Sequence, residues 1–196
     1  RAQFLNSAGL EMPYWYEENQ RLLEKYEDRV PTRSGWGAQY WSRIQGAEHL
    51  AMRESAGLFD LTSLAIIEIS GRDAAKFMDY VCTGKTNIKT GRVTYTLLCT
   101  LSGGIKRDVT VARLAADKYW LFTGNATVPQ ETDWLKRNAS GYDITITDRS
   151  QTYAALGLFG PHARKILEKV TPNDVSNKAF PFYTWQTLEI GMNTVF

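Results

Sequence analysis

The sequence is poor in residues that commonly bind metals. It contains only 2 cysteines and 2 histidines among 196 residues. These four residues, Cys82, Cys99, His49 and His162, lie in separate segments without the close spacing that metal sites use. We therefore expect no zinc or iron site. Each cysteine is better explained as a small apolar side chain than as a nucleophile or a disulfide partner.

Three further absences narrow the function. The 23 basic and 21 acidic residues leave a net charge of +2, and basic residues do not gather with aromatic ones along one element. We therefore expect no nucleic-acid partner. No apolar run approaches a membrane span and no signal-peptide pattern is present, so we expect a cytoplasmic protein, or one of the mitochondrial matrix in a eukaryote. A Gly-x-Gly-x-x-Gly fingerprint is also missing, which argues against dinucleotide binding on these residues.

What is present is the pattern of a folded α+β body in which a strand followed by a helix occurs twice. The apolar run at residues 66–69 leads through Gly71 into residues 74–81, where apolar side chains recur every three or four positions. Residues 155–159 lead through another glycine into residues 163–170 with the same spacing. Each helix is therefore predicted to bury one face.

The second unit looks shorter than the first. Two strands follow the first helix, whereas one strand, residues 186–190, is expected after the second. A sheet that lacks a strand exposes an unpaired edge, so we expect the second unit to be incomplete and the chain to be part of a longer polypeptide. Between the two units we predict strands at residues 119–123 and 142–147 and a helix at residues 129–138.

Residues 95–114 are the most informative stretch for function. Their side chains alternate on both sides of the Gly103-Gly104 turn, as in two paired strands. Asp108 begins the second strand, where a carboxylate can reach a cavity while its backbone stays rigid, as a general base or an electrostatic stabiliser requires. The structural alternative is that Asp108 caps the hairpin or pairs with Lys106 or Arg107.

The first 44 residues differ from the body. Aromatic clusters at residues 12–16 and 34–41 flank a charged segment at residues 17–29. We interpret residues 1–44 as an arm that packs its aromatic residues onto the body, and residues 45–196 as the main domain. The charged segment is typical of a solvated helix or loop, and we assign it no function.

Four runs, in order and at suitable intervals, resemble the glycine-cleavage aminomethyltransferase (T-protein) superfamily. They are GAEHLAMR (46–53), AGLFD (56–60), GG (103–104) followed by Asp108, and LFGPHA (158–163). The first 44 residues resemble one branch of this superfamily in particular. Their runs AGLEMPYWY (8–16) and GWG (35–37) are similar to the passage that joins the flavin part to the folate part in dimethylglycine and sarcosine dehydrogenases or oxidases. The resemblance implies two strand-helix-strand units with mostly antiparallel sheets.

The same resemblance implies a tetrahydrofolate-binding domain of an enzyme that oxidises an N-methyl amine. A covalently linked flavin domain, which would hold FAD, converts the amine to an iminium. The folate domain captures its one-carbon unit as 5,10-methylenetetrahydrofolate. Asp108 maps onto the acid that orients the folate N10 amine and stabilises the cationic adduct.

The resemblance also implies the residues that surround the folate. Tyr95 and Thr110 map onto pterin-pocket positions, and Thr110, two residues from Asp108, shares its face of the strand. The expected neighbours are Leu64, Thr123, Gly124 and Asn125. Each has a structural alternative, because Tyr95 and Leu64 could be core, Thr110 an ordinary strand residue, and residues 124–125 a turn.

Some motifs of the family are missing from this sequence, and other functions of the same fold must be compared with it. A later strand with an arginine and a Tyr-x-Gly-Glu-x-Gly motif, whose glutamate binds the pterin, is absent from these residues, so we expect them to bind folate weakly or not at all by themselves. A non-catalytic regulatory or scaffold protein could retain the fold, although an acid at Asp108 favours the enzyme. A folate-dependent helper of iron-sulfur proteins would carry a Lys-Gly-Cys-Tyr motif, which these residues lack.

Overall fold

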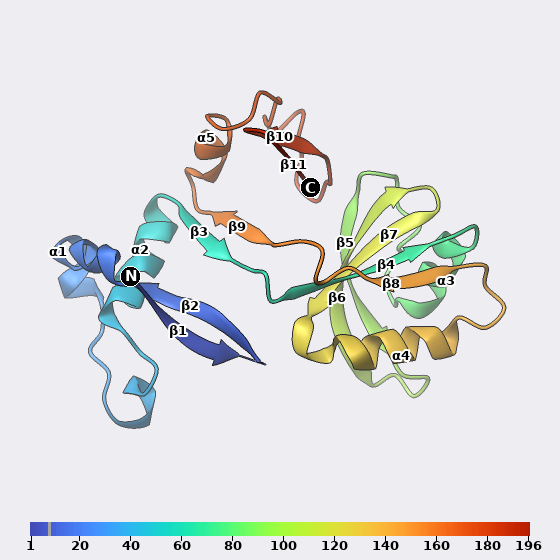
Figure 1. The fold of residues 1–196 in the computed structure, drawn as a ribbon, viewed down its shortest axis with the longest axis horizontal. Coiled ribbons are helices and arrows are strands. Elements are labelled where there is room, and N and C mark those ends of the chain that lie inside the picture. The colour runs from blue at the N-terminus through green and yellow to red at the C-terminus, as the bar shows by residue number, and fades with distance from the viewer. Residues whose placement is uncertain (8) are drawn as a thin grey trace. The chain divides into compact units, whose positions relative to one another are not determined.

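The computed structural model describes residues 1–7 and 9–196 and shows an α+β protein, as expected (Figure 1). All strand pairs in the described part of the chain are antiparallel. Packing divides the chain into two compact units, Arg1–Leu61 with Ala155–Leu167, and Thr62–Ala154 with Glu168–Phe196. The interpretation of residues 1–44 as a linking arm stays a prediction, and Ala8, which begins its AGLEMPYWY run, lies outside the described residues.

The first unit consists of a hairpin, short helices and a second pair of strands. Its elements are β1 (Ala2–Ser7), β2 (Leu10–Tyr16), η1 (Glu17–Arg21), α1 (Leu22–Tyr26), η2 (Glu27–Arg29), η3 (Gly35–Ala38), α2 (Arg43–Glu54), β3 (Gly57–Asp60), β9 (Leu156–Phe159) and α5 (Ala163–Leu167). Tyr26, Val30 and Ala47 form its buried core, with Trp41 packed against them. Gly46 permits this approach, because a Cβ there would lie 2.8 Å from Cγ1 of Val30.

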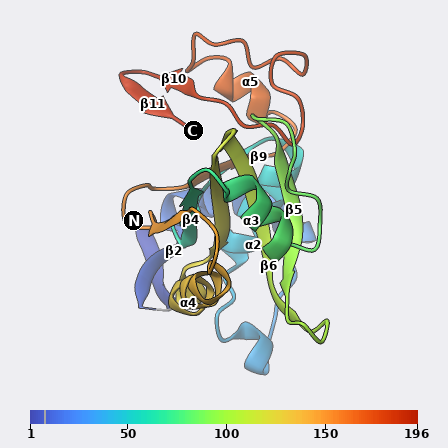
Figure 2. The ribbon, with the colours of Figure 1, turned by 90° about the vertical axis from the view of Figure 1, so that its right-hand side faces the viewer.

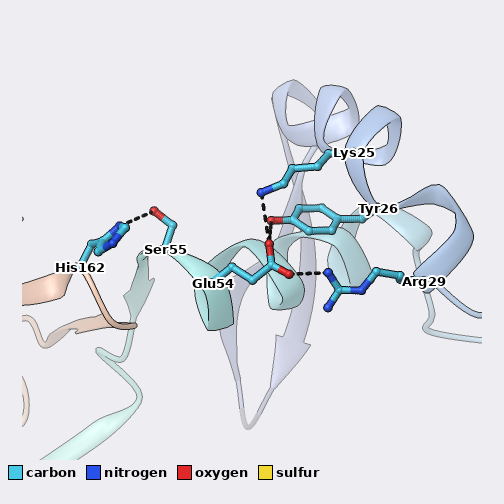
Figure 3. A network of polar contacts seen from close by, with 6 residues as sticks. All are labelled: Lys25, Tyr26, Arg29, Glu54, Ser55 and His162. Atoms are coloured by element: carbon cyan, nitrogen blue, oxygen red, sulfur yellow. Dashed lines mark hydrogen bonds and ion pairs between the residues drawn. The ribbon is translucent and has the colours of Figure 1, made fainter.

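A polar network closes the C-terminal end of α2 (Figure 3). The Glu54 carboxylate accepts hydrogen bonds from Arg29, from Tyr26 Oη at 2.9 Å and from Lys25 Nζ at 3.2 Å. These bonds lower the pKa of Glu54 to about 2, and the bond from Arg29 has the largest effect. The charged segment at residues 17–29, which we expected to be solvated, therefore also binds α1 and η2 to the end of α2.

The second unit is built on a five-stranded sheet with the order β5-β6-β7-β4-β8. Its elements are β4 (Leu64–Ser70), α3 (Ala74–Val81), β5 (Val93–Cys99), β6 (Ile105–Ala115), β7 (Lys118–Gly124), η4 (Asn125–Thr127), α4 (Val128–Asn138), β8 (Thr145–Asp148), β10 (Leu188–Ile190) and β11 (Asn193–Val195). The predicted strands and helices over residues 66–138 are confirmed. The last two strands pair only with each other within the described chain.

Helices α3 and α4 cover one face of this sheet (Figure 2). The core between them is made of side chains from both layers, among them Ile67, Phe77, Val111, Leu121 and Leu135. Alternation along the strands places the next residues on the opposite face. That opposite face, called the open face below, carries the candidate site.

Three predicted elements differ from the structure. Helix α5 ends at Leu167 and does not reach Val170, because residues 168–170 form turns. Pro172 further disfavours helix at Thr171. Strand β8 begins at Thr145 and not at residue 142, since the Ile144 amide donates to the Tyr142 carbonyl at 3.1 Å in a local turn. Strand β10 begins at Leu188, two residues after the predicted start.

The second strand-helix repeat does not build one sheet. Strand β9 pairs with β3, and β10 pairs with β11, so the strands on either side of α5 belong to different sheets. The sequence repeat therefore predicts the elements but not their partners.

Candidate functional site

The hairpin of β5 and β6 presents the candidate acid. Gly103 has φ 83°, a left-handed conformation that glycine adopts without strain, and its amide donates to the Thr100 carbonyl at 2.9 Å. In the register of the two strands Tyr95 lies opposite Thr110. Leu97 lies opposite Asp108. Because paired residues project to one face, Tyr95, Asp108 and Thr110 share the open face. The predicted common face of Asp108 and Thr110 is thus confirmed.

Tyr95 and Asp108 contact each other directly. The Tyr95 hydroxyl donates to Oδ2 of Asp108 at 3.1 Å. This hydrogen bond is the main cause that raises the pKa of Tyr95, because it stabilises the neutral phenol and the nearby negative charge opposes a phenolate. Asp108 is exposed and Tyr95 is 56% exposed, so both can meet a ligand from solution.

The neighbouring Arg107 does not pair with Asp108. It projects to the helix-covered face, where its Nε donates to Oε1 of Glu131 at 2.9 Å. The predicted alternative, an ion pair between Asp108 and Arg107, is therefore wrong, because Arg107 pairs with Glu131. Asp108 instead accepts a hydrogen bond at Oδ2 from Tyr95, and the residue is exposed.

The other expected site residues divide between the two faces. Leu64 lies opposite Gly124 in the pairing of β4 with β7, and both share the open face with Asp108. Thr123 has its side chain on the opposite face, where it is buried and its Oγ1 has no hydrogen-bond partner within the described chain. Asn125 lies past the strand in η4, where its amide donates to the Ser63 carbonyl at 3.0 Å.

The open face also carries a buried acid that the sequence reasoning missed. Glu68 accepts hydrogen bonds from Trp120 Nε1 at 2.9 Å and Arg149 Nη2 at 3.0 Å. Burial by itself would raise the pKa of Glu68, but the two bonds and the positive charges of Lys118 and Arg149 together lower it, and the pKa lies below its usual range. A glutamate inside the apolar run of β4 was the signal, since buried carboxylates need partners.

An aromatic cluster adjoins Glu68 on the same face. The Trp120 ring contacts the rings of Phe122, Tyr153, Trp185 and Phe196. Its ring-centroid distances are between 4.9 and 6.3 Å. The open face thus combines a packed aromatic end with an end where Tyr95 and Asp108 are accessible.

The arrangement suits electrostatic and proton chemistry on an amine. A carboxylate on a rigid strand, with one oxygen held by a phenol, can orient an N–H group and stabilise a positive charge. Within residues 1–7 and 9–196 no group of three or more histidine, cysteine, aspartate or glutamate side chains could hold a metal ion. The same residues include no helix that is long and apolar enough to cross a bilayer.

Comparison with known proteins identifies relatives along most of the chain. The model of the GCVT N-terminal domain family matches residues 1–196. The aminomethyltransferase of Lysinibacillus sphaericus (strain C3-41) is 34% identical over 163 residues, which are 83% of this chain and 44% of that protein. The aminomethyltransferase of Alkaliphilus metalliredigens (strain QYMF) is 30% identical over 174 residues, 88% of this chain and 47% of that protein. The chain therefore spans less than half the length of these relatives.

Solved structures show the same fold. The glycine cleavage system aminomethyltransferase T from Bartonella henselae superposes with a TM-score of 0.63 at 25% identity, covering 86% of this chain and 39% of that one. The heterotetrameric sarcosine oxidase from Corynebacterium sp. U-96 superposes with a TM-score of 0.57 at 18% identity, covering 76% and 74%. At that identity the second likeness concerns the fold alone. The expected T-protein-like fold is confirmed.

Proposed function

Because the chain belongs to the family of the GCVT N-terminal domain, we propose that it is the folate-binding part of an enzyme that transfers a one-carbon unit to tetrahydrofolate. Two curated relatives are named aminomethyltransferase. The observation that carries the proposal is the Tyr95–Asp108 pair, an accessible carboxylate oriented by a phenol on an open sheet face. Such a pair is suited to meeting the amine edge of a folate.

The open face fits a folate in chemistry. A folate presents a flat pterin ring, secondary amines and an acidic tail. Tyr95 offers an accessible ring for the flat part, and Oδ1 of Asp108 can accept a hydrogen bond from an amine N–H. In this proposal N10 of the folate lies against Asp108, and Tyr95 and Thr110 lie beside the pterin.

The residues of the chain would orient the amine and stabilise its charge. When bound, the folate supplies two nitrogens that take up the one-carbon unit of an iminium as its amine leaves and one proton is lost. Asp108 provides a negative charge next to the reacting nitrogen and can accept the proton at Oδ1. Tyr95 holds Oδ2, so the carboxylate does not need to reorient when positive charge develops.

We further propose that the enzyme is a dehydrogenase or oxidase of an N-methyl amine such as dimethylglycine or sarcosine. Support comes from the AGLEMPYWY and GWG runs of the first 44 residues. The sarcosine oxidase of Corynebacterium sp. U-96, by its name an enzyme that acts on sarcosine, also shares the fold. In this proposal the iminium comes from FAD chemistry on a linked flavin domain.

Binding and rate measurements on Asp108 variants test the proposal. NMR titration with tetrahydrofolate under anaerobic conditions should show Asp108→Asn binding roughly tenfold to a hundredfold more weakly, since a bond to a charged group contributes about 1.5 to 3 kcal/mol. Asp117→Asn, in the exposed turn at the other end of β6, is the matched control and should bind normally. Equal affinity of wild type and Asp108→Asn contradicts the assigned role of Asp108.

A kinetic test separates capture from oxidation. In the enzyme that joins this chain to its flavin domain, Asp108→Ala should leave flavin reduction by the amine nearly intact. It should slow folate-dependent capture by roughly a hundredfold, the usual contribution of one acid-base group. Equal loss of both activities would indicate misfolding, and retention of both would refute the mechanism.

A further inference from the structure

The strand segment that carries Asp108 is held by a partner strand on one side only. Residues 105–109 of β6 pair with β5. Pairing with β7 begins at Thr110, so in the described chain the other edge of this segment has no strand partner. A segment paired on one side shifts more easily than one held on both sides, because fewer backbone hydrogen bonds oppose the movement. The position of Asp108 therefore depends on further contacts.

Strand β5, in contrast, is fixed along its outer edge. The Thr83 amide donates to the Leu97 carbonyl at 2.9 Å, directly opposite Asp108 in the strand register. At the start of β5 the Val93 amide donates to the carbonyl of Tyr183, a residue held in the strained left-handed region at φ 55°. The less restrained side of the hairpin is therefore the β6 segment that contains Asp108.

One buried ion pair ties this segment to the helix layer. Arg107, the residue before Asp108, donates from Nε to Oε1 of Glu131 at 2.9 Å. Glu131 lies on α4 and is 1% exposed, and its Oε2 has no hydrogen-bond partner within residues 1–7 and 9–196. A buried carboxylate is costly unless it is paired, so the contact with Arg107 is strongly favoured at this position.

The same helix follows the other flank of the candidate site. Strand β7 ends at Gly124, which shares the open face with Asp108, and α4 begins at Val128 after the short helix η4. The bond to Arg107 therefore connects the segment that carries the acid with the helix that follows Gly124. Arg107 and Asp108 are adjacent and project to opposite faces, so this bond restrains the backbone of the acid without occupying the open face.

A buried ion pair is better suited to fixing a geometry than to adding stability. Replacing both charges of such a pair by apolar side chains is often neutral or stabilising, because desolvation offsets the attraction. Apolar contact, however, has no preferred direction. A hydrogen bond from a guanidinium to a carboxylate oxygen is directional. The pair can thus select one position of the strand even where its net contribution to stability is small.

We propose that Arg107 and Glu131 are positioning residues of the candidate site, because their bond on the covered face holds β6 where the Asp108 carboxylate meets Tyr95 on the open face. This inference rests on the proposed function, in which that carboxylate orients the amine of a folate. Misplacing a reacting group by about 1 Å can reduce a rate by about a hundredfold. The pair therefore acts on the reaction through Asp108, without touching the reactants.

Two double variants separate the direction of the bond from the packing. Arg107→Met, Glu131→Leu keeps apolar contact and removes the bond. Arg107→Gln, Glu131→Gln removes both charges but can keep the bond, because Nε2 of a glutamine is as many covalent bonds from the backbone as Nε of an arginine, and the acceptor at Oε1 remains. We expect both variants to unfold cooperatively in urea, and the second alone to retain the position of Asp108.

The Tyr95 hydroxyl reports the position of Asp108 without any folate. Its pKa is raised chiefly by the hydrogen bond to Asp108, with the smallest contribution from Tyr183. In NMR of ring-labelled tyrosine, Arg107→Met, Glu131→Leu should lower the Tyr95 midpoint part of the way that Asp108→Ala lowers it. Arg107→Gln, Glu131→Gln should keep the wild-type midpoint. A contribution to stability alone would not move this midpoint in a folded variant.

Capture of the one-carbon unit gives a second readout. In the enzyme that joins this chain to its flavin domain, Arg107→Met, Glu131→Leu should slow folate-dependent capture by roughly tenfold to a hundredfold and leave flavin reduction nearly intact. The glutamine pair should capture at close to the wild-type rate. The matched control removes the exposed ion pair of α4, and Arg137→Met, Asp133→Leu should change neither the midpoint nor the rate.

The Tyr95 midpoints decide the inference. A wild-type midpoint in Arg107→Met, Glu131→Leu overturns it, because apolar packing then suffices. A lowered midpoint in both double variants overturns it as well, since a retained bond then fails to retain the position. If the apolar variant does not unfold cooperatively, Arg107→Met and Arg107→Gln replace the comparison, and equal midpoints in these two overturn the inference.

Failure of the proposed function is a separate outcome. If Asp108→Asn leaves folate binding and capture unchanged, the proposed function fails. The Tyr95 midpoints of the folate-free variants then still decide whether the pair of Arg107 and Glu131 positions Asp108. If Asp108→Asn loses affinity while both double variants keep the wild-type midpoint, the proposed function stands and the positioning role is overturned.

Discussion

Arg107, the residue before the candidate acid, donates from Nε to Oε1 of Glu131 at 2.9 Å, and Glu131 is 1% exposed. This ion pair joins β6 to α4 at a position where β6 pairs with β5 on one side and has no strand partner on the other. The pairing of β6 with β7 begins at Thr110, whereas Arg107 and Asp108 pair with β5. The buried pair therefore anchors the segment of β6 that carries Asp108.

Breaking this pair should destabilise the second unit. Arg107→Met leaves the Glu131 carboxylate buried without a cation, and we expect a loss of about 3 to 5 kcal/mol in the free energy of unfolding. The double variant Arg107→Met, Glu131→Leu removes both charges and should recover most of this loss. Urea unfolding of the three proteins measures both values.

The control for this prediction is an exposed ion pair on the same helix. Arg137 and Asp133 of α4 lie 2.9 Å apart with both side chains exposed. Arg137→Met should change the free energy of unfolding by less than about 1 kcal/mol, because exposed pairs contribute little. Equal losses for Arg107→Met and Arg137→Met would show that burial of Glu131 has no energetic consequence.

The Tyr95–Asp108 bond should be visible in a titration. Asp108→Ala removes the main cause of the raised pKa of Tyr95, so the phenol should titrate at lower pH, toward its ordinary value of about 10. NMR of ring-labelled tyrosine measures this midpoint. Tyr183→Phe should lower the midpoint by less than Asp108→Ala does. An unchanged midpoint in Asp108→Ala would mean that the hydrogen bond does not form in solution.

Glu54 should make the first unit sensitive to acid. Its pKa is lowered from 4.5 to about 2 by bonds from Arg29, Tyr26 and Lys25. A lowered pKa in the folded state contributes stability that is complete above about pH 4.5 and is lost as the pH falls toward 2. The stability difference between wild type and Glu54→Gln should therefore shrink over this range.

Urea unfolding at several pH values measures this dependence. Glu24→Gln, an exposed glutamate on α1, is the control and should differ from wild type by a small amount at every pH. A stability difference for Glu54→Gln that stays constant between pH 4.5 and 2 would contradict the linkage.

Much of the candidate site could be predicted from the sequence because it depends on local order. The two-residue period of β5 and β6 and the Gly103-Gly104 turn set the hairpin, and the hairpin places Tyr95, Asp108 and Thr110 on one face. The position of these residues depends on neighbours within about twenty positions of the chain. The sequence could therefore indicate which side chains meet, although the roles given to them remain predictions.

Contacts between distant segments could not be predicted. The alternation along β7 indicates that Thr123 and Gly124 point to opposite faces, but only the packed helices reveal which face is open. Glu68 meets Arg149 across 81 positions, and Tyr183 reaches the edge of β5 from a segment without regular secondary structure. None of these contacts leaves a periodic signal.

The sequence by itself determined the hairpin, the acid at its mouth and the amphipathic helices, because backbone preferences and side-chain alternation act over a few residues. Tertiary structure decided that β9 pairs with β3, that α5 ends at Leu167 and that Tyr183 adopts its strained conformation. These outcomes depend on hydrogen bonds and burial supplied by remote parts of the chain. Such interactions override local preference when they satisfy backbone groups that the segment cannot satisfy within itself.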